Sequence, residues 1–436
     1  MLELFSSGLV SLWLNMAGVP NALSVGDPSS WQETPWIMLP GLTDPIAQTN
    51  LQNYLKLLKA KGLPETSQGV WIQEGATLLS EHQGTTPLPA ASLTKIATSL
   101  VSLETWGPYH QFETLVGGTG ILQGGVLQGD LVIQGGGDPF FVWEEAIALG
   151  NALNQLGIKR ITGNLVITGK FAMNYETDPA KAGKMLKEGL DSRTWTEEPQ
   201  YQYQTLPLGT PRPQVEIGGS VQVVTQPPRS QFLLIRHQSL PLAQILKQMN
   251  IYSNNAIAEM LAELLGGGKL VAQEAAAAAS ITPTEIRLVN GSGLGAENRI
   301  SPRAICAMLM AIQRYLRPYR LTVADLFPVA GKDVGTIEGR KIPENSAVKT
   351  GTLSDVSALA GVMPTRDRGL IWFAIVNRGT DLEGLRAGQD VLLQSLSKQW
   401  GGSLSPAIAL PLNTETQQNN FRLGDPNRLQ RLVFKP

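Results

Sequence analysis

The stretch from about residue 112 to 236 has a different sequence pattern from both ends of the chain, and this difference constrains the fold more than any other feature. Within it, short apolar segments such as DLVIQGGGDP and GNLVITG end in glycine, a pattern typical of β-strands joined by tight turns. One helical segment, VWEEAIALGNALNQLG, interrupts the strands. The flanking parts are rich in helical patterns. We therefore predict an inserted β-rich domain over residues 112–236 of a mixed α/β (α+β) chain.

Outside the insert, apolar residues at helical spacing predict amphipathic helices, of which the clearest are residues 45–60, 91–105, 301–316 and 382–400. The segment QGVWIQEGATLLSEHQG predicts a hairpin around Glu74-Gly75. Residues 175–215 are polar and contain prolines, so we expect loops there. The polar tail, residues 402–436, is expected to run extended over the surface.

Composition and charge exclude several classes of protein. The 35 basic and 36 acidic residues form no basic stripe, so nucleic acid is not expected as a partner. The single cysteine, Cys306, excludes an intrachain disulfide and lies in an apolar run typical of a core. The histidines His82, His110 and His237 are scattered and show no metal-ligand spacing. We therefore expect no metal and no cofactor, and neither a histidine triad nor a zinc hydrolase.

The N-terminal segment, residues 1–25, is ambiguous. It contains an apolar stretch that is too short to span a membrane and has the length of a signal-peptide core. However, Glu3 stands where a positive region belongs, and no Lys or Arg precedes Lys56. A cleaved signal, an anchor at the membrane surface and a packed helix all stay open at this point.

Ser92-Leu-Thr-Lys95 places a hydroxyl and an amine three residues apart on a predicted helix. Residues at i and i+3 share a helix face, so Lys95 can reach the Ser92 oxygen. A serine needs a base to become a nucleophile, and a lysine can serve where burial and a nearby cation disfavour its charged form. The motif alone is weak, because its spacing arises by chance about once or twice in a chain of this length.

Ser253-Asn254-Asn255 lies between two predicted helices. A serine there can relay protons, and an asparagine amide can hold a substrate carbonyl. An ordinary helix N-cap is the alternative explanation, since Ser and Asn are favoured at that position.

Lys349-Thr350-Gly351-Thr352 lies at the end of a predicted strand. The lysine and the threonine hydroxyls suit a carboxylate, and Gly351 lets a substrate backbone approach closely. A β-turn with a basic neighbour is the structural alternative.

The order of the three motifs carries more weight than any one of them. Ser-x-x-Lys, Ser-x-Asn and Lys-Thr-Gly fall on a helix, an inter-helix loop and a strand, the set known from β-lactamases and penicillin-binding proteins. Longer stretches extend the similarity: LPAASLTK, GDLVIQGGGDP, ILKQMNIYSNNAIAEMLAELLG, LVNGSGLGAENRISP, VAGKDVGTIEGR and AVKTGTL. On these residues, from roughly 65 to 400, the chain resembles the class C penicillin-binding proteins, the D-Ala-D-Ala carboxypeptidase/endopeptidase family.

The resemblance implies a role for each residue of the first two motifs. Ser92 would be the nucleophile that forms an acyl-enzyme, and Lys95 its base. Ser253 would pass the proton toward the leaving group, and Asn255 would bind a substrate amide. The chemistry implied is that of a serine-type peptidase inhibited by penicillin.

The third motif is implied to bind the C-terminal end of the substrate. Lys349, Thr350 and Thr352 would receive the carboxylate, with Gly351 between them. The backbone N–H groups of Ser92 and Thr352 would form the oxyanion hole, which is often the largest catalytic contribution.

The resemblance also implies the architecture and the partners. A penicillin-binding/β-lactamase-like peptidase domain, with helices flanking an antiparallel sheet, would be built from residues 1–111 and 237–401. Residues 112–236 would be the insert and 402–436 an extended tail. Peptidoglycan stem peptides would be the substrate and β-lactam antibiotics the inhibitors. Because wall peptides lie outside the cytoplasmic membrane, we expect a location in the periplasm or cell envelope.

Two rival functions differ from this expectation. A β-lactamase-like hydrolase shares all three motifs, but the long insert argues against its compact architecture. A non-catalytic penicillin-binding or wall-binding protein would not need Lys95.

Selectivity for the wall peptide's diamino acid can also be anticipated. In the family, the strand that here reads GNLVITG is usually followed by an aspartate that grips the charged amine. Here Gly169 and Lys170 stand just before Phe171, so we expect an ammonium group to meet no carboxylate there. The nearby GGG-Asp138-Pro segment is expected to be only a turn.

Overall fold

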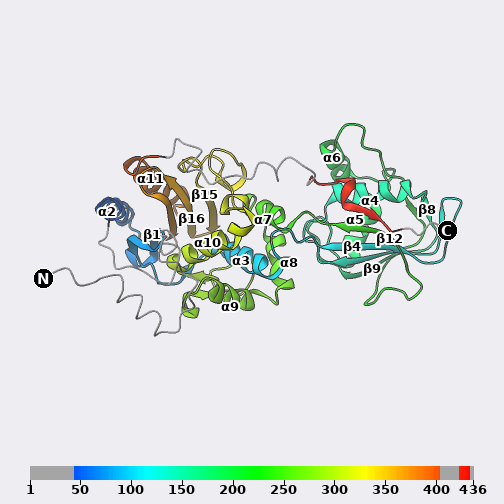
Figure 1. Ribbon diagram of the computed structural model, residues 1–436, viewed down its shortest axis with the longest axis horizontal. Coiled ribbons are helices and arrows are strands. Elements are labelled where there is room, and N and C mark those ends of the chain that lie inside the picture. The colour runs from blue at the N-terminus through cyan, green and yellow to red at the C-terminus, as the bar shows by residue number, and fades with distance from the viewer. Residues whose placement is uncertain (1–43, 403–421, 433–436) are drawn as a thin grey trace, which may run out of the picture.

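Two bodies of secondary structure lie side by side along the long axis of the protein (Figure 1). The structure, a computed structural model, describes residues 44–402 and 422–432. The predictions for residues 1–25, and for most of the tail, fall outside the described residues. None of the helices in the described ranges is long and apolar enough to cross a membrane.

The first body is built on a five-stranded antiparallel sheet in the order β15-β16-β17-β1-β2. Its strands are β1 (Gln68–Glu74), β2 (Thr77–His82), β15 (Ala347–Leu353), β16 (Val356–Thr365) and β17 (Gly369–Arg378). Because β1 pairs with β17, both ends of the chain contribute to one sheet, as the resemblance implied. The hairpin predicted around Glu74-Gly75 is the β1–β2 pair.

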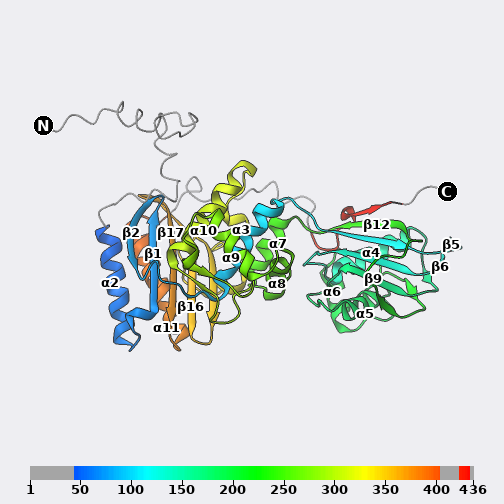
Figure 2. The same cartoon turned by 90° about the horizontal axis from the view of Figure 1, so that it is seen from below.

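Helices cover both faces of this sheet (Figures 1 and 2). On β17, Phe373 packs into the core formed with helices α2 and α11, whereas its neighbour Ala374 belongs to the core on the opposite face. This alternation is the period of two expected for a strand buried on both sides. The helices are α2 (Pro45–Ala60), α3 (Thr94–Trp106), α7 (Leu242–Ile251), α8 (Asn255–Leu264), α9 (Gly268–Ala278), α10 (Pro302–Leu316) and α11 (Leu382–Gln399). Cys306 is buried among them, as predicted.

The second body comprises most of residues 113–238 and has its own hydrophobic core. A six-stranded sheet runs in the order β11-β9-β7-β4-β12-β18, and a four-stranded sheet in the order β10-β8-β6-β5. The strands are β4 (Glu113–Gly118), β5 (Ile121–Gln123), β6 (Val126–Gln128), β7 (Leu131–Gly136), β8 (Arg160–Ile161), β9 (Leu165–Lys170), β10 (Glu216–Ile217), β11 (Val221–Val223), β12 (Phe232–Gln238) and β18 (Leu429–Arg431). Helix α4 (Trp143–Gln155) is the one that the sequence predicted inside the insert. A small separate sheet joins β3 (Leu88–Pro89), β13 (Ile286–Arg287) and β14 (Arg299–Ile300).

The prediction of loops over residues 175–215 is wrong. This region forms helices α5 (Pro179–Gly189) and α6 (Glu197–Thr205). Asp178 caps α5 by accepting a hydrogen bond from the Lys181 N–H, and Pro179 occupies the first helical turn, so the helix has a regular start. The buried residues of α5 are small or isolated, such as Ala182 and Leu186. The apolar pattern was therefore too weak to predict a helix from the sequence.

The described end of the tail also differs from the expectation of a chain lying on the surface. Residues 429–431 form β18, which pairs antiparallel with β12 of the insert. Arg428 is buried, and its guanidinium donates hydrogen bonds to the Glu145 carboxylate and the Gln238 carbonyl. This described end of the tail is therefore held to the insert by a buried ion pair and a strand pairing.

Candidate active site

Ser92 lies in a single 3₁₀ turn, Ala91–Leu93, that leads into helix α3. The sequence predicted a continuous helix from residue 91, so the first turn is tighter than expected. Ala91 has φ +47°, a left-handed conformation that is costly for a residue with a side chain and is typical of functional sites. Gly293 makes this turn possible, because a Cβ there would lie 1.9 Å from the Ala91 carbonyl oxygen.

Lys95 is buried one turn after Ser92 and is held by three oxygen atoms. Its Nζ lies 3.0 Å from Ser92 Oγ, 2.7 Å from Asn255 Oδ1 and 2.8 Å from the Ser292 carbonyl oxygen. Burial lowers the pKa of Lys95 to about 7, although the negative charge of Glu259 opposes the shift. A neutral amine has two N–H donors and one lone pair, so it can donate to Asn255 and Ser292 and accept from the Ser92 hydroxyl.

Ser253 and Asn255 lie at the junction of α7 and α8. The capping role that explained this motif as ordinary structure falls to Asn254, whose Oδ1 accepts a hydrogen bond from the Ile257 N–H at 3.0 Å. Ser253 has φ +54°, again a left-handed conformation. The cap therefore leaves Ser253 and Asn255 available for contacts with the two lysines.

Lys349 lies inside edge strand β15, not at a strand end as the sequence suggested. It is fully buried, and its Nζ donates to Ser253 Oγ at 3.0 Å and to the Thr350 carbonyl oxygen at 2.8 Å. Burial and the charge of Lys95 hold the pKa of Lys349 well below its usual range. Of the two causes considered from the sequence, burial and a nearby cation, burial is the main one that lowers the pKa of Lys95.

The rest of β15 runs against the turn that carries Ser92. A Cβ at Gly351 would lie 3.0 Å from the Ala90 carbonyl oxygen and 3.2 Å from the Ser92 nitrogen. Thr350 donates a hydrogen bond to Thr336, and Thr352 Oγ1 accepts one from Arg386 at 3.1 Å. The structure thus brings the eight candidate site residues of the three motifs into one neighbourhood.

Sequence reasoning missed three residues that support this site. Ser292 supplies its carbonyl oxygen to Lys95, and the Glu259 carboxylate accepts hydrogen bonds from the backbone of Gly291 and Ser292. Arg386 reaches Thr352 from helix α11, 34 residues away. Backbone and long-range contacts of this kind have no local sequence signature.

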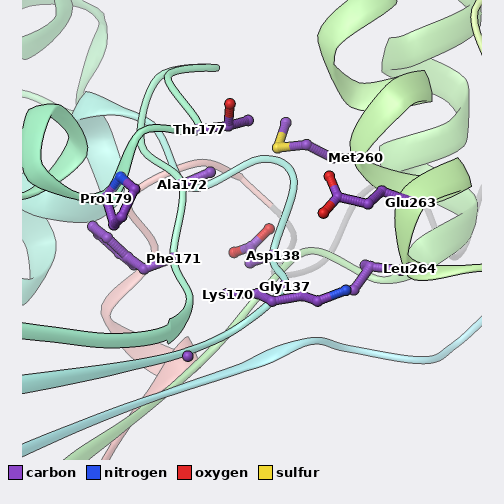
Figure 3. Close-up of a pocket in the computed structure, with 11 residues that line it drawn as sticks. Gly137, Asp138, Lys170, Phe171, Ala172, Thr177, Pro179, Met260, Glu263 and Leu264 are labelled. Carbon is purple, nitrogen blue, oxygen red and sulfur yellow. The ribbon is translucent and has the colours of Figure 1, made fainter. Parts of the chain in front are cut away.

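The expectation that an ammonium group would meet no carboxylate near Gly169 is wrong. Gly169 and Lys170 line a cavity of about 190 Å³ together with Asp138 and Glu263 (Figure 3). Asp138 accepts a hydrogen bond from the Phe140 N–H at 2.8 Å, and burial raises its pKa to about 6. The turn predicted at Asp138 is present, but it also supplies a carboxylate to this cavity. The sequence argument considered only the residues that follow GNLVITG, whereas Asp138 follows a different strand.

Comparison with known proteins places this geometry in a family context. The sequence profile of the D-Ala-D-Ala carboxypeptidase 3 (S13) family matches residues 48–179 and 199–399. A D-alanyl-D-alanine carboxypeptidase from Haemophilus influenzae is 25% identical over 408 residues, which covers 70% of this chain and 84% of that protein.

Two solved structures share the fold. The penicillin G acylated predatory endopeptidase of Bdellovibrio bacteriovorus, in complex with an immunity protein, has a TM-score of 0.66 at 22% identity and covers 83% of this chain and 98% of its own. Penicillin binding protein 4 from Haemophilus influenzae has a TM-score of 0.59 at 21% identity and covers 79% and 98%, respectively. The arrangement of sheet and flanking helices is thus the one seen in penicillin-binding proteins.

Proposed function

Because the chain belongs to the D-Ala-D-Ala carboxypeptidase 3 (S13) family, we propose that Ser92 is its nucleophile and that Lys95 is the base that activates it. Membership makes the chain a serine-type D-Ala-D-Ala carboxypeptidase acting on peptidoglycan peptides through an acyl-enzyme. The observation that carries the proposal is the placement of the Lys95 amine, 3.0 Å from Ser92 Oγ, at a buried position that lowers its pKa to about 7.

Acylation begins when the lone pair of Lys95 takes the Ser92 proton and Ser92 Oγ attacks the carbonyl carbon of the penultimate D-Ala. The carbonyl oxygen gains charge beside the backbone N–H groups of Ser92 and Thr352, which would form the oxyanion hole. The bond to the terminal D-Ala breaks, and its amine takes a proton through Ser253. Water then hydrolyses the ester and regenerates the Ser92 hydroxyl.

Lys349, Thr350 and Thr352 are proposed to bind the carboxylate of the terminal D-Ala. Lys349 lies 3.0 Å from Ser253 Oγ, so a carboxylate beside it would hold the leaving group next to the proposed proton relay. Asn255 is proposed to bind a substrate amide with the side-chain nitrogen, since its Oδ1 is occupied by Lys95.

The division of labour between the two bodies is also a proposal. Residues 1–111 and 237–401 would carry the chemistry, because all three motifs lie there, and the insert at 112–236 would serve recognition. Peptidoglycan stem peptides would be the partner, β-lactams the inhibitors, and the periplasm or cell envelope the location.

Intact-protein mass spectrometry after incubation with penicillin tests the proposal. The wild-type protein should gain the mass of one penicillin molecule, and Ser92→Ala should gain none while unfolding at the same temperature. Ser102→Ala, at a buried serine on the same helix, is a matched control and should keep the adduct. An adduct that persists on Ser92→Ala would refute the assignment.

A further inference from the structure

A groove runs from the Ser-x-Asn loop onto the surface of the insert. It consists of two adjoining cavities of about 280 and 720 Å³, which share Asn174, Tyr175 and Gln202. The smaller cavity is lined by Tyr252 and Asn254, the two neighbours of Ser253. We call the two cavities together the aromatic groove. None of the side chains assigned to the mechanism lines either cavity, so the groove is a separate surface that begins beside the Ser-x-Asn loop.

The larger of the two cavities, which we call the outer cavity, is lined by aromatic rings and by polar planar groups. Tyr201 is 67% exposed and Tyr175 is 38% exposed, while Trp143, which lines the same cavity, is buried. The indole Nε1 of Trp143 has no hydrogen-bond partner among residues 44–402 and 422–432, which is uncommon for a buried donor. The other lining residues are amides and carboxylates: Asn174, Glu197, Glu198, Gln200, Gln202 and Gln204.

Tyr175 is held where the two cavities meet by a strained turn. Asn174 has φ +50° and Tyr175 has φ +69°, so two consecutive residues with side chains adopt the left-handed conformation. Such a conformation costs on the order of 1–3 kcal/mol per residue and persists only where the surroundings enforce it. Here an antiparallel β-bridge between Met173 and Glu176 closes the turn. The Tyr175 ring stacks on the Phe140 ring, with 6.2 Å between the ring centroids. This strain places an aromatic ring at the junction of the two cavities.

The composition of the groove indicates the chemistry of its ligand. Aromatic faces pack against apolar surfaces, such as the C–H face of a pyranose ring, while asparagine and glutamine amides both donate to and accept from hydroxyl and acetamido groups. Among the residues that the structure describes, neither Lys nor Arg lines the outer cavity, which disfavours a phosphate or nucleic acid ligand. A volume of about 720 Å³ falls in the range of small-molecule sites.

We infer that the aromatic groove binds the glycan strand of peptidoglycan, through its N-acetylated hexosamine units. The inference rests on the proposed function and deepens it, because it names the part of the substrate that accompanies the stem peptide. Four residues separate the bond proposed to be cut from the sugar, and an extended chain spans about 3.3–3.6 Å per residue, or roughly 13–14 Å in all. The smaller cavity lies between the Ser-x-Asn loop and the outer cavity, where that peptide would run.

Two measurements test the inference. The first is calorimetric binding, to the intact chain, of a peptide-free glycan of alternating N-acetylglucosamine and N-acetylmuramic acid whose lactyl carboxyl groups are amidated, as they are where the stem peptide is attached. The second compares kcat/KM on a disaccharide pentapeptide and on the same pentapeptide without sugar. The wild type should bind the glycan and prefer the sugar-bearing substrate by about tenfold or more. Tyr201→Ala should abolish both effects, and Tyr201→Phe, which keeps the ring, should retain them.

Tyr109→Ala is the control, since Tyr109 is another exposed tyrosine, at 49% against 67% for Tyr201, and lines neither cavity. It should keep both the binding and the preference. A wild-type protein that is acylated by penicillin, yet shows no glycan binding and no preference for the sugar-bearing substrate, would refute glycan binding by the groove and leave the proposed function intact. Glycan binding without penicillin uptake would refute the proposed function instead. Equal glycan binding by Tyr201→Ala and the wild type would also overturn the inference.

Discussion

Replacing Lys95 with arginine removes the proposed base and fixes a positive charge at its position. An arginine side chain stays protonated in proteins, so it has no lone pair to accept the Ser92 proton. Lys95 Nζ contacts Ser92 Oγ, Asn255 Oδ1 and the Ser292 carbonyl oxygen, and a guanidinium can still donate to oxygen atoms of this kind. The change therefore targets proton transfer more than the hydrogen bonds around the site.

The size of the effect follows from the pKa. An ordinary lysine with a pKa of 10.5 is neutral in only about one molecule in 3,000 at pH 7, whereas a pKa of about 7 makes half of the molecules neutral, a gain of roughly 1,500-fold. General base catalysis contributes about 10²–10⁴-fold to rates. We therefore expect Lys95→Arg to slow penicillin acylation by about a thousandfold. In the wild type, the acylation rate should fall about tenfold per pH unit below pH 6 and level off above pH 8, because only the deprotonated amine is a base.

Stopped-flow or quenched mass spectrometry between pH 5.5 and 8.5 measures both effects. Lys247→Arg is a burial-matched control, because Lys247 is also largely buried and donates to backbone carbonyl groups and Asp333 away from the three motifs. It should acylate at close to the wild-type rate. A Lys95→Arg protein that acylates within tenfold of wild type, or a wild-type rate that does not change over this pH range, would show that Lys95 is not the base.

Three further predictions concern the fold. Arg428→Ala should lower the free energy of unfolding in urea by about 3–5 kcal/mol, because it leaves the buried Glu145 carboxylate without its guanidinium partner, whereas Arg431→Ala on the surface should change it by less than about 0.5 kcal/mol. Cys306 should not react with a thiol reagent until the protein unfolds, since burial raises the pKa of its thiol; rapid labelling of the folded protein would contradict this. Excising residues 112–236 with a short linker should leave some penicillin acylation; a soluble, folded deletion protein without any would count against the proposed division.

The motif residues could be predicted because their signals are local. Ser92 and Lys95 share a helix face through their spacing, and Lys349 lies in an apolar alternating segment that had to be a strand. What remained open was the distance between motifs, since Asn255 and Lys95 are separated by 160 residues and only the fold brings them to 2.7 Å. The expectation that the motifs meet in one site came from the resemblance to a known family, which has the same motifs in the same order.

The failures have a common physical cause, which is stabilisation by distant contacts. Helix α5 packs closely on the sheet at Gly183, where a Cβ would lie 2.6 Å from Val221 Cγ1, so its position depends on a strand 38 residues away. Arg428 is buried because Glu145, 283 residues earlier, neutralises it. Neither a glycine in a polar helix nor an arginine in a polar tail carries a local sign of its burial.

The two lysines suggest how carboxylate recognition could be coupled to catalysis. Burial lowers the pKa of both, and the charge of Lys95 lowers that of Lys349 further, so in the free protein the pair disfavours carrying two protons at neutral pH. A substrate carboxylate beside Lys349 would raise the pKa of Lys349, and the charge fixed there would lower the pKa of Lys95. We hypothesise that a bound carboxylate thereby raises the neutral fraction of Lys95 above the half expected in the free protein at pH 7. A peptide ending in an amide should then lose kcat as well as affinity, whereas a loss confined to KM would mean that Lys349 contributes binding alone.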